Sequence, residues 1–90
     1  MIKVFKKNNT IEDFDIDKIK TSILNAGDDL NYKFNESDIN LISHNVMKKI
    51  INNHPSTYRT NVYEIRCLIY SELIEFGCKD VAYSYMNMKI

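Results

Sequence analysis

The sequence has few of the residues that interrupt or cross-link a chain. Its 90 residues include one proline, two glycines, two cysteines and no tryptophan. So little proline and glycine, with 44% apolar residues, excludes a disordered chain. A chain of this length has room for one domain, so we expect residues 1–90 to form a single domain. Because no apolar run approaches the roughly 20 residues of a membrane-spanning helix, we expect no membrane association.

The two cysteines form no recognised metal-binding pattern. Cys67 and Cys78 lie eleven positions apart, and neither C-x-x-C nor H-x-x-x-H accompanies them. His44 and His54 complete no such pattern either. Two cysteines without a hydrophobic signal segment suit a reducing compartment. We therefore expect a cytoplasmic protein with free thiols and no metal held by its own side chains.

Charge of one sign is not in excess. Twelve basic residues balance twelve acidic ones, so the formal net charge is zero. Non-specific nucleic-acid binding needs a basic excess or at least a basic face, so we do not expect direct nucleic-acid binding. Lys3, Lys6 and Lys7 leave room for a local basic patch near the N-terminus.

The usual catalytic motifs are missing as well. The sequence has no G-x-S-x-G, H-E-x-x-H, G-x-x-x-x-G-K-[ST] or G-x-G-x-x-G. Four carboxylates within residues 12–17 could form acid–base pairs or a metal site, but we favour their stabilising a helix start. Neither His44 nor His54 has an identifiable nucleophile or orienting partner. We expect that the protein is not an enzyme.

Apolar periodicity predicts an α+β fold in the order β-β-α-α-β-α-α: a four-helix bundle capped by a small two- to three-stranded sheet. Residues 1–5 and 10–14 form an N-terminal β-hairpin around a tight turn at Asn8-Asn9. A loop over residues 28–35 should tuck its apolar side chains inward, namely Leu30, Tyr32 and Phe34. The four helices are predicted to begin at Asp15, at Asn35 or Ser37, at Asn61 and near Lys79. The first helix is predicted to end at Gly27 and the third at Gly77. A short strand is predicted over residues 56–60.

Lys18 is in an unusual place for a cation. It falls in the first turn of a predicted helix, where the helix dipole disfavours positive charge. Local conflicts of this kind often mark a functional position. A surface ion pair with Asp15 or Asp17 explains it equally well, so both interpretations stay open.

Lys6 supports an anion-binding hypothesis. Strand alternation puts it on the same face as Ile2 and Val4. That face could offer apolar surface to a flat ring and an ammonium group to a phosphate. Together with Lys7 and Lys18, Lys6 therefore indicates a candidate anion site.

Three motifs resemble the ATP-cone domain family. Residues 4–19 resemble its opening motif, V-x-K-R-D-G-x-x-E-x-F-D-x-x-K-I. Residues 64–69 fit its E-I-x-x-L-V helix, and residues 77–85 resemble its closing G-x-x-x-V-A-x-x-Y. The resemblance covers nearly the whole chain. It implies a four-helix bundle capped by a three-stranded sheet, in agreement with the periodicity.

The resemblance also implies a function. ATP-cone domains usually stand at the N-terminus of ribonucleotide reductase large subunits or of a bacterial repressor of reductase genes, where they bind ATP or dATP and change oligomeric state. We therefore expect an allosteric module for adenine nucleotides, with Mg²⁺ as an ion that could accompany the phosphates. Its partner would be a second copy in a homo-oligomer, or a separate reductase or regulator subunit.

Two alternatives remain. One is a protein–protein or oligomerisation module that keeps the cone fold but has a degenerate nucleotide site. Its motivation is a set of tyrosines expected partly on helix exteriors, where tyrosine suits interfaces: Tyr58, Tyr63, Tyr70, Tyr83 and Tyr85. The other is a transcriptional regulator, which at zero net charge would need a partner to bind DNA.

The resemblance assigns nucleotide-binding roles to individual residues. A glutamate at the adenine edge can accept a hydrogen bond from the adenine amino group, whereas a guanine oxo group there would repel it. By position, the matches are Lys6 and Lys7 for the phosphates, Glu12 and Asp15 for the adenine edge, Lys18 for the helix lysine that approaches the nucleotide, Arg66 for the ribose or phosphates, Lys89 for a basic residue near the end of the last helix, and Val4 and Ile19 for packing on the base.

The sequence departs from the family pattern in three places. Lys7 replaces the arginine of the basic pair, so a bidentate phosphate contact is lost. Asn8-Asn9 replaces an Asp-Gly turn and adds side chains where phosphates approach. Val62 stands where a threonine usually opens the third helix.

Overall fold

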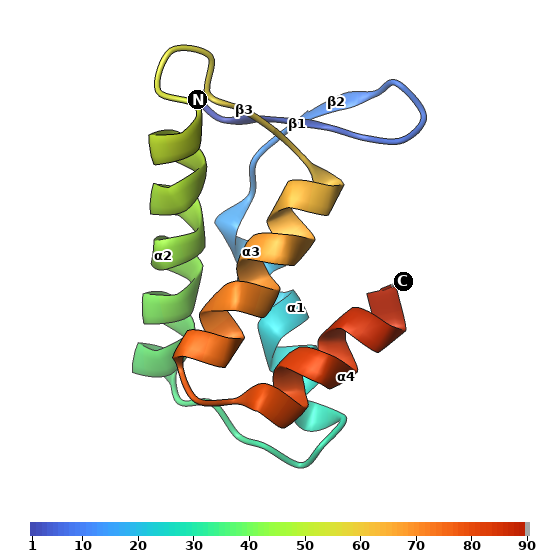
Figure 1. Ribbon diagram of the computed structural model, residues 1–90, viewed down its shortest axis with the longest axis vertical. Coiled ribbons are helices and arrows are strands. Elements are labelled where there is room, and N and C mark those ends of the chain that lie inside the picture. Colours follow the sequence, from blue (N-terminus) through green and yellow to red (C-terminus); the bar gives the residue numbers. More distant parts are fainter. Residues whose placement is uncertain (90) are drawn as a thin grey trace.

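The computed structural model describes residues 1–89, with side chains described through Asn87. Within this range, a three-stranded sheet covers one end of a bundle of four helices (Figure 1). The predicted α+β class and the order β-β-α-α-β-α-α are confirmed. The elements are β1 (Lys3–Phe5), β2 (Ile11–Asp13), α1 (Ile16–Asp28), α2 (Glu36–Asn53), β3 (Arg59–Asn61), α3 (Val62–Glu75) and α4 (Lys79–Lys89).

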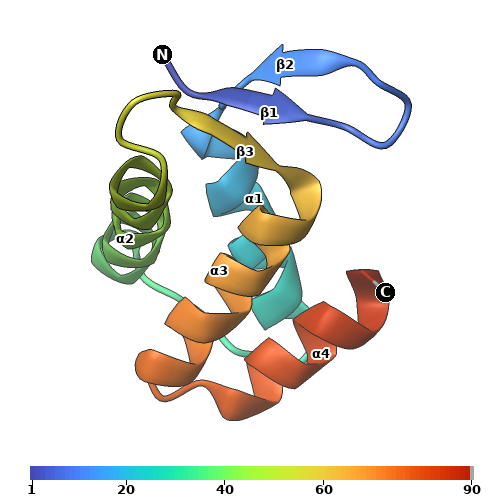
Figure 2. The same ribbon diagram turned by 45° about the horizontal axis from the view of Figure 1, so that its top comes forward.

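The sheet has β1 in its centre. It pairs with β2 in the antiparallel sense and with β3 in the parallel sense (Figure 2). The register places Glu12, Val4 and Thr60 side by side in one row across the three strands. Since Val4 and Thr60 are buried, this row faces the helices. The row therefore connects the hairpin to the start of α3.

All four helices contribute to one hydrophobic core. The stripes predicted from three- and four-residue spacing are buried in large part, and Ile23, Val46, Ile50, Leu73 and Ala82 have no exposed surface. Burial of each large apolar side chain contributes roughly 1.5–3 kcal/mol relative to exposure. Ile2 from the N-terminal segment joins this core and holds the sheet against the bundle. The apolar spacing of the last helix also predicts burial of Met88, whose side chain lies outside the described residues.

The helix starts are set by local side-chain hydrogen bonds. Asp15 Oδ1 accepts a bond from the Asp17 amide at 2.9 Å, which caps α1. Asn35 forms a reciprocal capping box with Asp38 at the start of α2. Asn61 Oδ1 accepts from the amide three residues on, at 2.8 Å, and caps α3. These three starts agree with the sequence prediction.

Gly27 does not end the first helix. The helix continues to Asp28, and Gly27 is buried within its last turn. A Cβ atom there would lie 2.7 Å from the Tyr32 carbonyl oxygen and 2.9 Å from the Phe34 ring. The glycine therefore lets the following loop pass close to the helix, which is a tertiary requirement rather than a local one.

Two further local predictions were wrong in detail. Of the three loop side chains expected inside, only Phe34 is buried, while Leu30 and Tyr32 are 43% and 40% exposed. The third strand starts at Arg59 rather than at residue 56. The cause is Tyr58, whose φ of 51° is left-handed and cannot belong to an extended strand.

The helices do not have the properties of membrane-spanning segments. Among residues 1–89, none of them is both long enough and apolar enough to cross a membrane.

Candidate functional site

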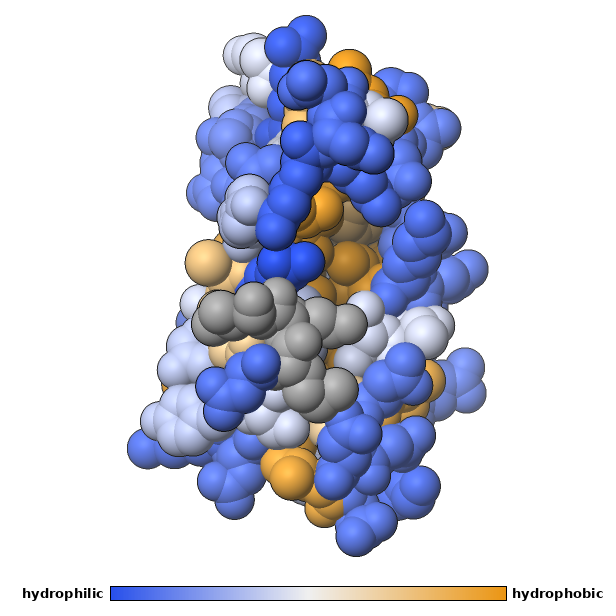
Figure 3. Space-filling view, turned by 90° about the vertical axis from the view of Figure 1, so that its right-hand side faces the viewer, coloured by the Kyte–Doolittle hydropathy of each residue, from blue (hydrophilic) through white to orange (hydrophobic). Residues whose placement is uncertain are grey.

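A cavity lies beneath the β1–β2 hairpin. The hairpin overhangs the side of the bundle where α4 ends (Figure 1). Figure 3 views this side and shows a hydrophobic floor between hydrophilic residues. The cavity has a volume of about 130 Å³. The hairpin, the start of α1 and the first turn of α3 form its wall. Its lining residues are Val4, Lys6, Glu12, Asp13, Phe14, Asp15, Lys18, Ile19, Val62 and Ile65.

Six of the nine residues singled out from the sequence line this cavity. They come from both hairpin strands and from the first turn of α1, so the fold brings them together around one space. Lys7 and Arg66 do not line it, and the side chain of Lys89 lies outside the described residues. The six are Val4, Lys6, Glu12, Asp15, Lys18 and Ile19.

The hairpin turn fixes where Lys6 stands. The Lys6 amide donates to the Thr10 carbonyl at 2.9 Å, and the Asn9 amide donates to the Lys6 carbonyl at 3.2 Å. Asn9 takes a φ of 65°, the left-handed conformation that asparagine tolerates well. Asn8 Oδ1 accepts from the Thr10 hydroxyl at 2.6 Å, which closes the turn from inside. The Asn8-Asn9 pair therefore makes the tight turn without a glycine.

Glu12 joins the hairpin to α1 electrostatically. Its Oε1 lies 3.1 Å from Lys6 Nζ and 3.7 Å from Lys18 Nζ. The hydrogen bond from Lys6, helped by the charge of Lys18, holds the pKa of the Glu12 carboxyl below its ordinary value. The carboxylate partner of Lys18 is thus Glu12, and not Asp15 or Asp17 as the surface-pair interpretation had it. Two cations and one anion therefore meet at the rim of the cavity.

The floor of the cavity is apolar. Val4 and Ile19 are buried, and Val62 and Ile65 are half-buried at the start of α3. Val62 replaces the threonine of the family pattern, so this wall offers methyl groups where a hydroxyl is usual. Such a surface suits one face of a flat heteroaromatic ring better than it suits phosphate.

Lys7 and Arg66 meet at a residue that the sequence did not single out for the site. The Lys7 ammonium lies 5.3 Å from the centre of the Tyr63 ring, and the Arg66 guanidinium lies 5.9 Å from it. Both distances fall within the range of cation–π attraction. Tyr63 follows Val62, which lines the cavity, but Tyr63 itself does not line it. The two cations that contact the Tyr63 ring therefore lie beside the cavity rather than in it. The sequence signal that could have identified Tyr63 is its spacing from Arg66, because residues three apart on a helix lie side by side.

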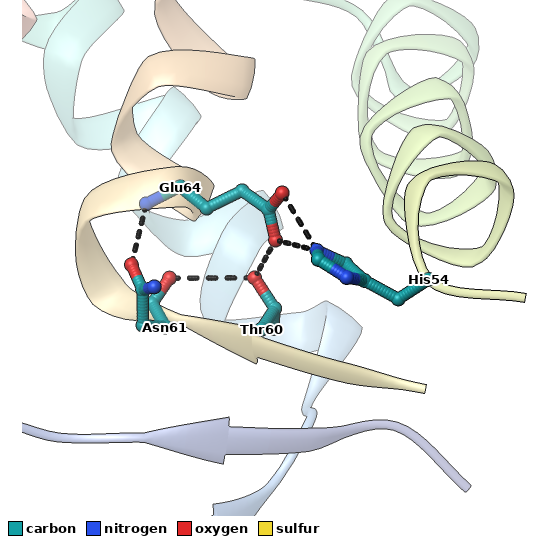
Figure 4. Close-up of polar contacts among 4 residues, drawn as sticks. All are labelled: His54, Thr60, Asn61 and Glu64. Atoms are coloured by element: carbon teal, nitrogen blue, oxygen red, sulfur yellow. Dashed lines mark hydrogen bonds and ion pairs between the residues drawn. The ribbon is translucent and has the colours of Figure 1, made fainter. Parts of the chain in front are cut away.

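A second polar cluster lies at the other end of the Glu12–Val4–Thr60 row (Figure 4). His54 Nε2, just after α2, lies 3.0 and 2.9 Å from the two carboxylate oxygens of Glu64. Thr60 donates its hydroxyl to the same carboxylate. Sequence reasoning found no orienting partner for His54, and this was wrong, because Glu64 is ten residues away and approaches only in the folded chain.

The Glu64 carboxylate is held in its charged form. Burial raises its pKa, but the hydrogen bonds from Thr60 and His54 outweigh that effect and leave the pKa below its ordinary value. A charged carboxylate only accepts hydrogen bonds, so His54 donates to it from Nε2. Glu64 is thus satisfied by two donors and ties α2, β3 and α3 together.

Within the described residues, no group of three or more His, Cys, Asp or Glu side chains is arranged to hold a metal ion. Cys67 is exposed and Cys78 is buried, and both are free thiols.

A protein-family model matches the sequence. The model of the ATP cone domain family matches residues 2–90, nearly the whole chain. No curated protein matches the sequence. ATP cone domains are regulatory rather than catalytic, and they bind ATP or dATP as effectors. The chain therefore belongs to the ATP cone domain family, and this membership indicates a nucleotide-binding regulatory module.

Proposed function

We propose that the chain binds ATP or dATP in the cavity beneath the hairpin and, through this binding, regulates a ribonucleotide reductase or a related regulator. The observation that carries the proposal is the meeting of Lys6, Lys18 and Glu12 at the rim of a cavity with an apolar floor. A nucleotide presents features complementary to these. Its flat ring matches the apolar floor, the polar edge of the ring matches the carboxylate, and the negatively charged phosphates match the two lysines.

The base would lie in the cavity. At about 130 Å³, the cavity is smaller than the roughly 300–1,000 Å³ of most ligand pockets. It therefore suits the ring, with the ribose and phosphates over the open rim. In this arrangement Val4 and Ile19 pack against the ring, and Val62 and Ile65 supply the opposite wall.

Glu12 would select adenine. Its carboxylate stays charged, because its pKa is lowered by Lys6 and Lys18. A charged carboxylate accepts a hydrogen bond from the adenine amino group and repels the oxo group that guanine carries there. Asp15, whose Oδ1 caps α1, lines the same wall and has a second carboxylate oxygen for the base.

Lys6 and Lys18 would bind the phosphates. Both are more than a third exposed and share Glu12 as their partner, so a phosphate can reach them from solvent. Hydrogen bonds between ammonium groups and phosphate oxygens are charge-assisted and stronger than neutral ones. We place Lys7 and Arg66 farther along the phosphate chain, beside Tyr63. The binding role of Lys89 stays a prediction.

Calorimetric titration with ATP, dATP and GTP tests the proposal. We expect ATP and dATP to bind and to raise the melting temperature, because a ligand held only by the folded state stabilises that state. GTP should bind at least tenfold more weakly. Neither heat nor a thermal shift at millimolar ATP and dATP would contradict the proposal. Titrations with and without Mg²⁺ measure whether the ion accompanies the phosphates.

The regulated partner is the finer part of the proposal. We propose a reductase or regulator subunit in the cytoplasm, bound differently with ATP than with dATP. The immobilised chain, incubated with purified reductase subunits and each nucleotide in turn, tests this directly. Nucleotide-dependent retention would support it, and equal retention with ATP, with dATP and with neither would contradict it.

Exposed tyrosines favour a second candidate function, an oligomerisation module. Tyr63 and Tyr83 are 56% and 50% exposed, and Tyr83 stacks on the half-buried Tyr70 at 6.2 Å. Tyr85, in contrast, is buried in the core. Light scattering with and without nucleotide separates the two functions. An oligomer whose mass ignores ATP and dATP would favour the second.

A further inference from the structure

Tyr63 gathers two cations on one exposed aromatic ring. It is the second residue of α3, and 56% of its surface is exposed. Lys7 reaches it from the hairpin and Arg66 from the next turn of α3, at 5.3 and 5.9 Å from the ring centre. Two like charges repel each other, and the attraction of both to one ring offsets part of that repulsion.

These two cations differ from the other pair at the site. Lys6 and Lys18 share one carboxylate, Glu12, which offsets one of their two positive charges. Among the described side chains, neither Lys7 nor Arg66 forms an ion pair with a carboxylate. The quadrupole of a ring attracts a cation without cancelling its charge. Lys7 and Arg66 therefore leave uncompensated positive charge beside the cavity.

The position of this charge decides which part of a ligand it meets. Val62, next to Tyr63 in the chain, and Ile65, next to Arg66, both line the cavity wall. A ring bound in the cavity would thus have Lys6 and Lys18 on the hairpin and α1 side, and Lys7 and Arg66 on the α3 side. A monophosphate is short and can be satisfied by the first pair, whereas a longer phosphate chain extends toward the second.

We propose that Tyr63 is a positioning residue that holds Lys7 and Arg66 ready for the distal phosphates and so sets the preference for nucleoside triphosphates over monophosphates. This inference rests on the proposed nucleotide function. Tyr63 itself contributes no charge to the ligand. It lowers the entropic cost of ordering two long cationic side chains at the moment of binding.

The test compares ATP and AMP affinities in Tyr63→Leu, Tyr63→Phe and the wild type. Loss of the ring should weaken ATP binding by roughly three- to tenfold and leave AMP binding unchanged, so that the ATP-to-AMP affinity ratio falls by the same factor. Phenylalanine keeps an aromatic face and should restore the ratio. Tyr83→Leu is the matched control, because Tyr83 is similarly exposed on α4 and should leave the ratio unchanged.

Three outcomes separate this inference from the proposed function. No ATP binding by the wild type would overturn both. ATP binding with an unchanged ratio in Tyr63→Leu would overturn this inference alone. If Tyr63→Leu does not fold, Tyr63→Gln replaces it, because a polar side chain suits this exposed helix position, and there too a falling ratio supports the inference and an unchanged one overturns it.

Discussion

Two glutamates, Glu12 at one end of the sheet row and Glu64 beside Thr60 at the other end, differ in their partners and in their surroundings. Glu12 contacts Lys6 and Lys18 at 3.1 and 3.7 Å, and 41% of its side chain is exposed. Glu64 is 22% exposed and contacts the buried Thr60 and the ring of His54. Lysines are long and flexible, whereas threonine and histidine have few rotatable bonds.

This difference separates a site that can exchange partners from a site that holds the fold. Exposed lysine–carboxylate pairs contribute little to stability, because water and salt screen them. A phosphate can therefore replace Glu12 as the partner of Lys6 at small cost. A half-buried carboxylate that satisfies a buried hydroxyl is expensive to remove. Glu64 therefore belongs to the residues that hold the fold around the cavity, which we call the frame. Glu12 belongs to the residues that can contact a ligand, which we call the surface of the site.

Glu64→Ala should give the largest effect. It leaves the buried Thr60 hydroxyl with only its long bond to the Asn61 carbonyl, at 3.4 Å, and frees His54. We expect a cost of about 2 kcal/mol. For a domain of this size, that corresponds to a fall in melting temperature of roughly 10 °C. Thermal denaturation followed by circular dichroism measures it. Glu75→Ala on the same helix is the control, since 66% of the Glu75 side chain is exposed. An equal fall in melting temperature in the two variants would contradict the distinction between the frame and the surface of the site.

Lys6→Ala should weaken ATP binding roughly tenfold or more, because a charge-assisted phosphate contact is lost. The melting temperature without nucleotide should stay close to that of the wild type. Calorimetry and thermal denaturation measure the two quantities separately. Lys33→Ala is the matched control: Lys33 forms a similar exposed pair with Asp28 at 3.2 Å, away from the cavity. Unchanged affinity in Lys6→Ala would place the phosphates elsewhere.

The pH dependence of stability should show the same contrast. The pKa of Glu64 is lowered from 4.5 in the folded state, so the folded state favours the charged carboxylate. Its contribution to stability is present above about pH 4.5 and is lost as the pH falls through the lower, folded pKa. The stability gap between the wild type and Glu64→Gln should therefore shrink below about pH 4.5. Urea titrations between pH 3.5 and 7 measure this gap, and a gap that widens on acidification would reverse the sign of our argument.

Glu12→Gln should have the smallest effect on stability. The pKa of Glu12 is also lowered, chiefly by Lys6, but this carboxylate is exposed and screened. We expect no resolvable change in the urea midpoint at any pH from 3.5 to 7. The same variant should narrow the preference for ATP over GTP, because a glutamine amide can also donate to a guanine oxo group. A large change in stability would place Glu12 in the frame.

Most of the fold could be predicted from the sequence, because its signals are local. The Asn8-Asn9 turn and the Asp15, Asn35 and Asn61 caps depend on residues at most three positions away. The helix stripes follow from a period of 3.6 residues, which needs no knowledge of the partner helix. The family motifs added the candidate site, since they fix residue types at known spacings.

Contacts between distant segments needed the tertiary structure. Gly27 looked like a helix end, but the approach of Tyr32 and Phe34 explains it. His54 had no partner in sequence, and Glu64 supplies one across the gap between α2 and α3. Neither contact can be predicted from a repeating sequence pattern, because each depends on a single residue in one segment meeting another segment in the folded chain.

The sequence alone determined the elements, their order and the residue types available for binding, since hydrogen bonds and periodicity within a few residues encode them. Tertiary structure decided which charges meet: Glu12 with Lys6 and Lys18, and Lys7 with Arg66 on Tyr63. The physical reason is that electrostatic and cation–π attraction depend on distances through space, and those distances are fixed only when the hairpin packs on the bundle.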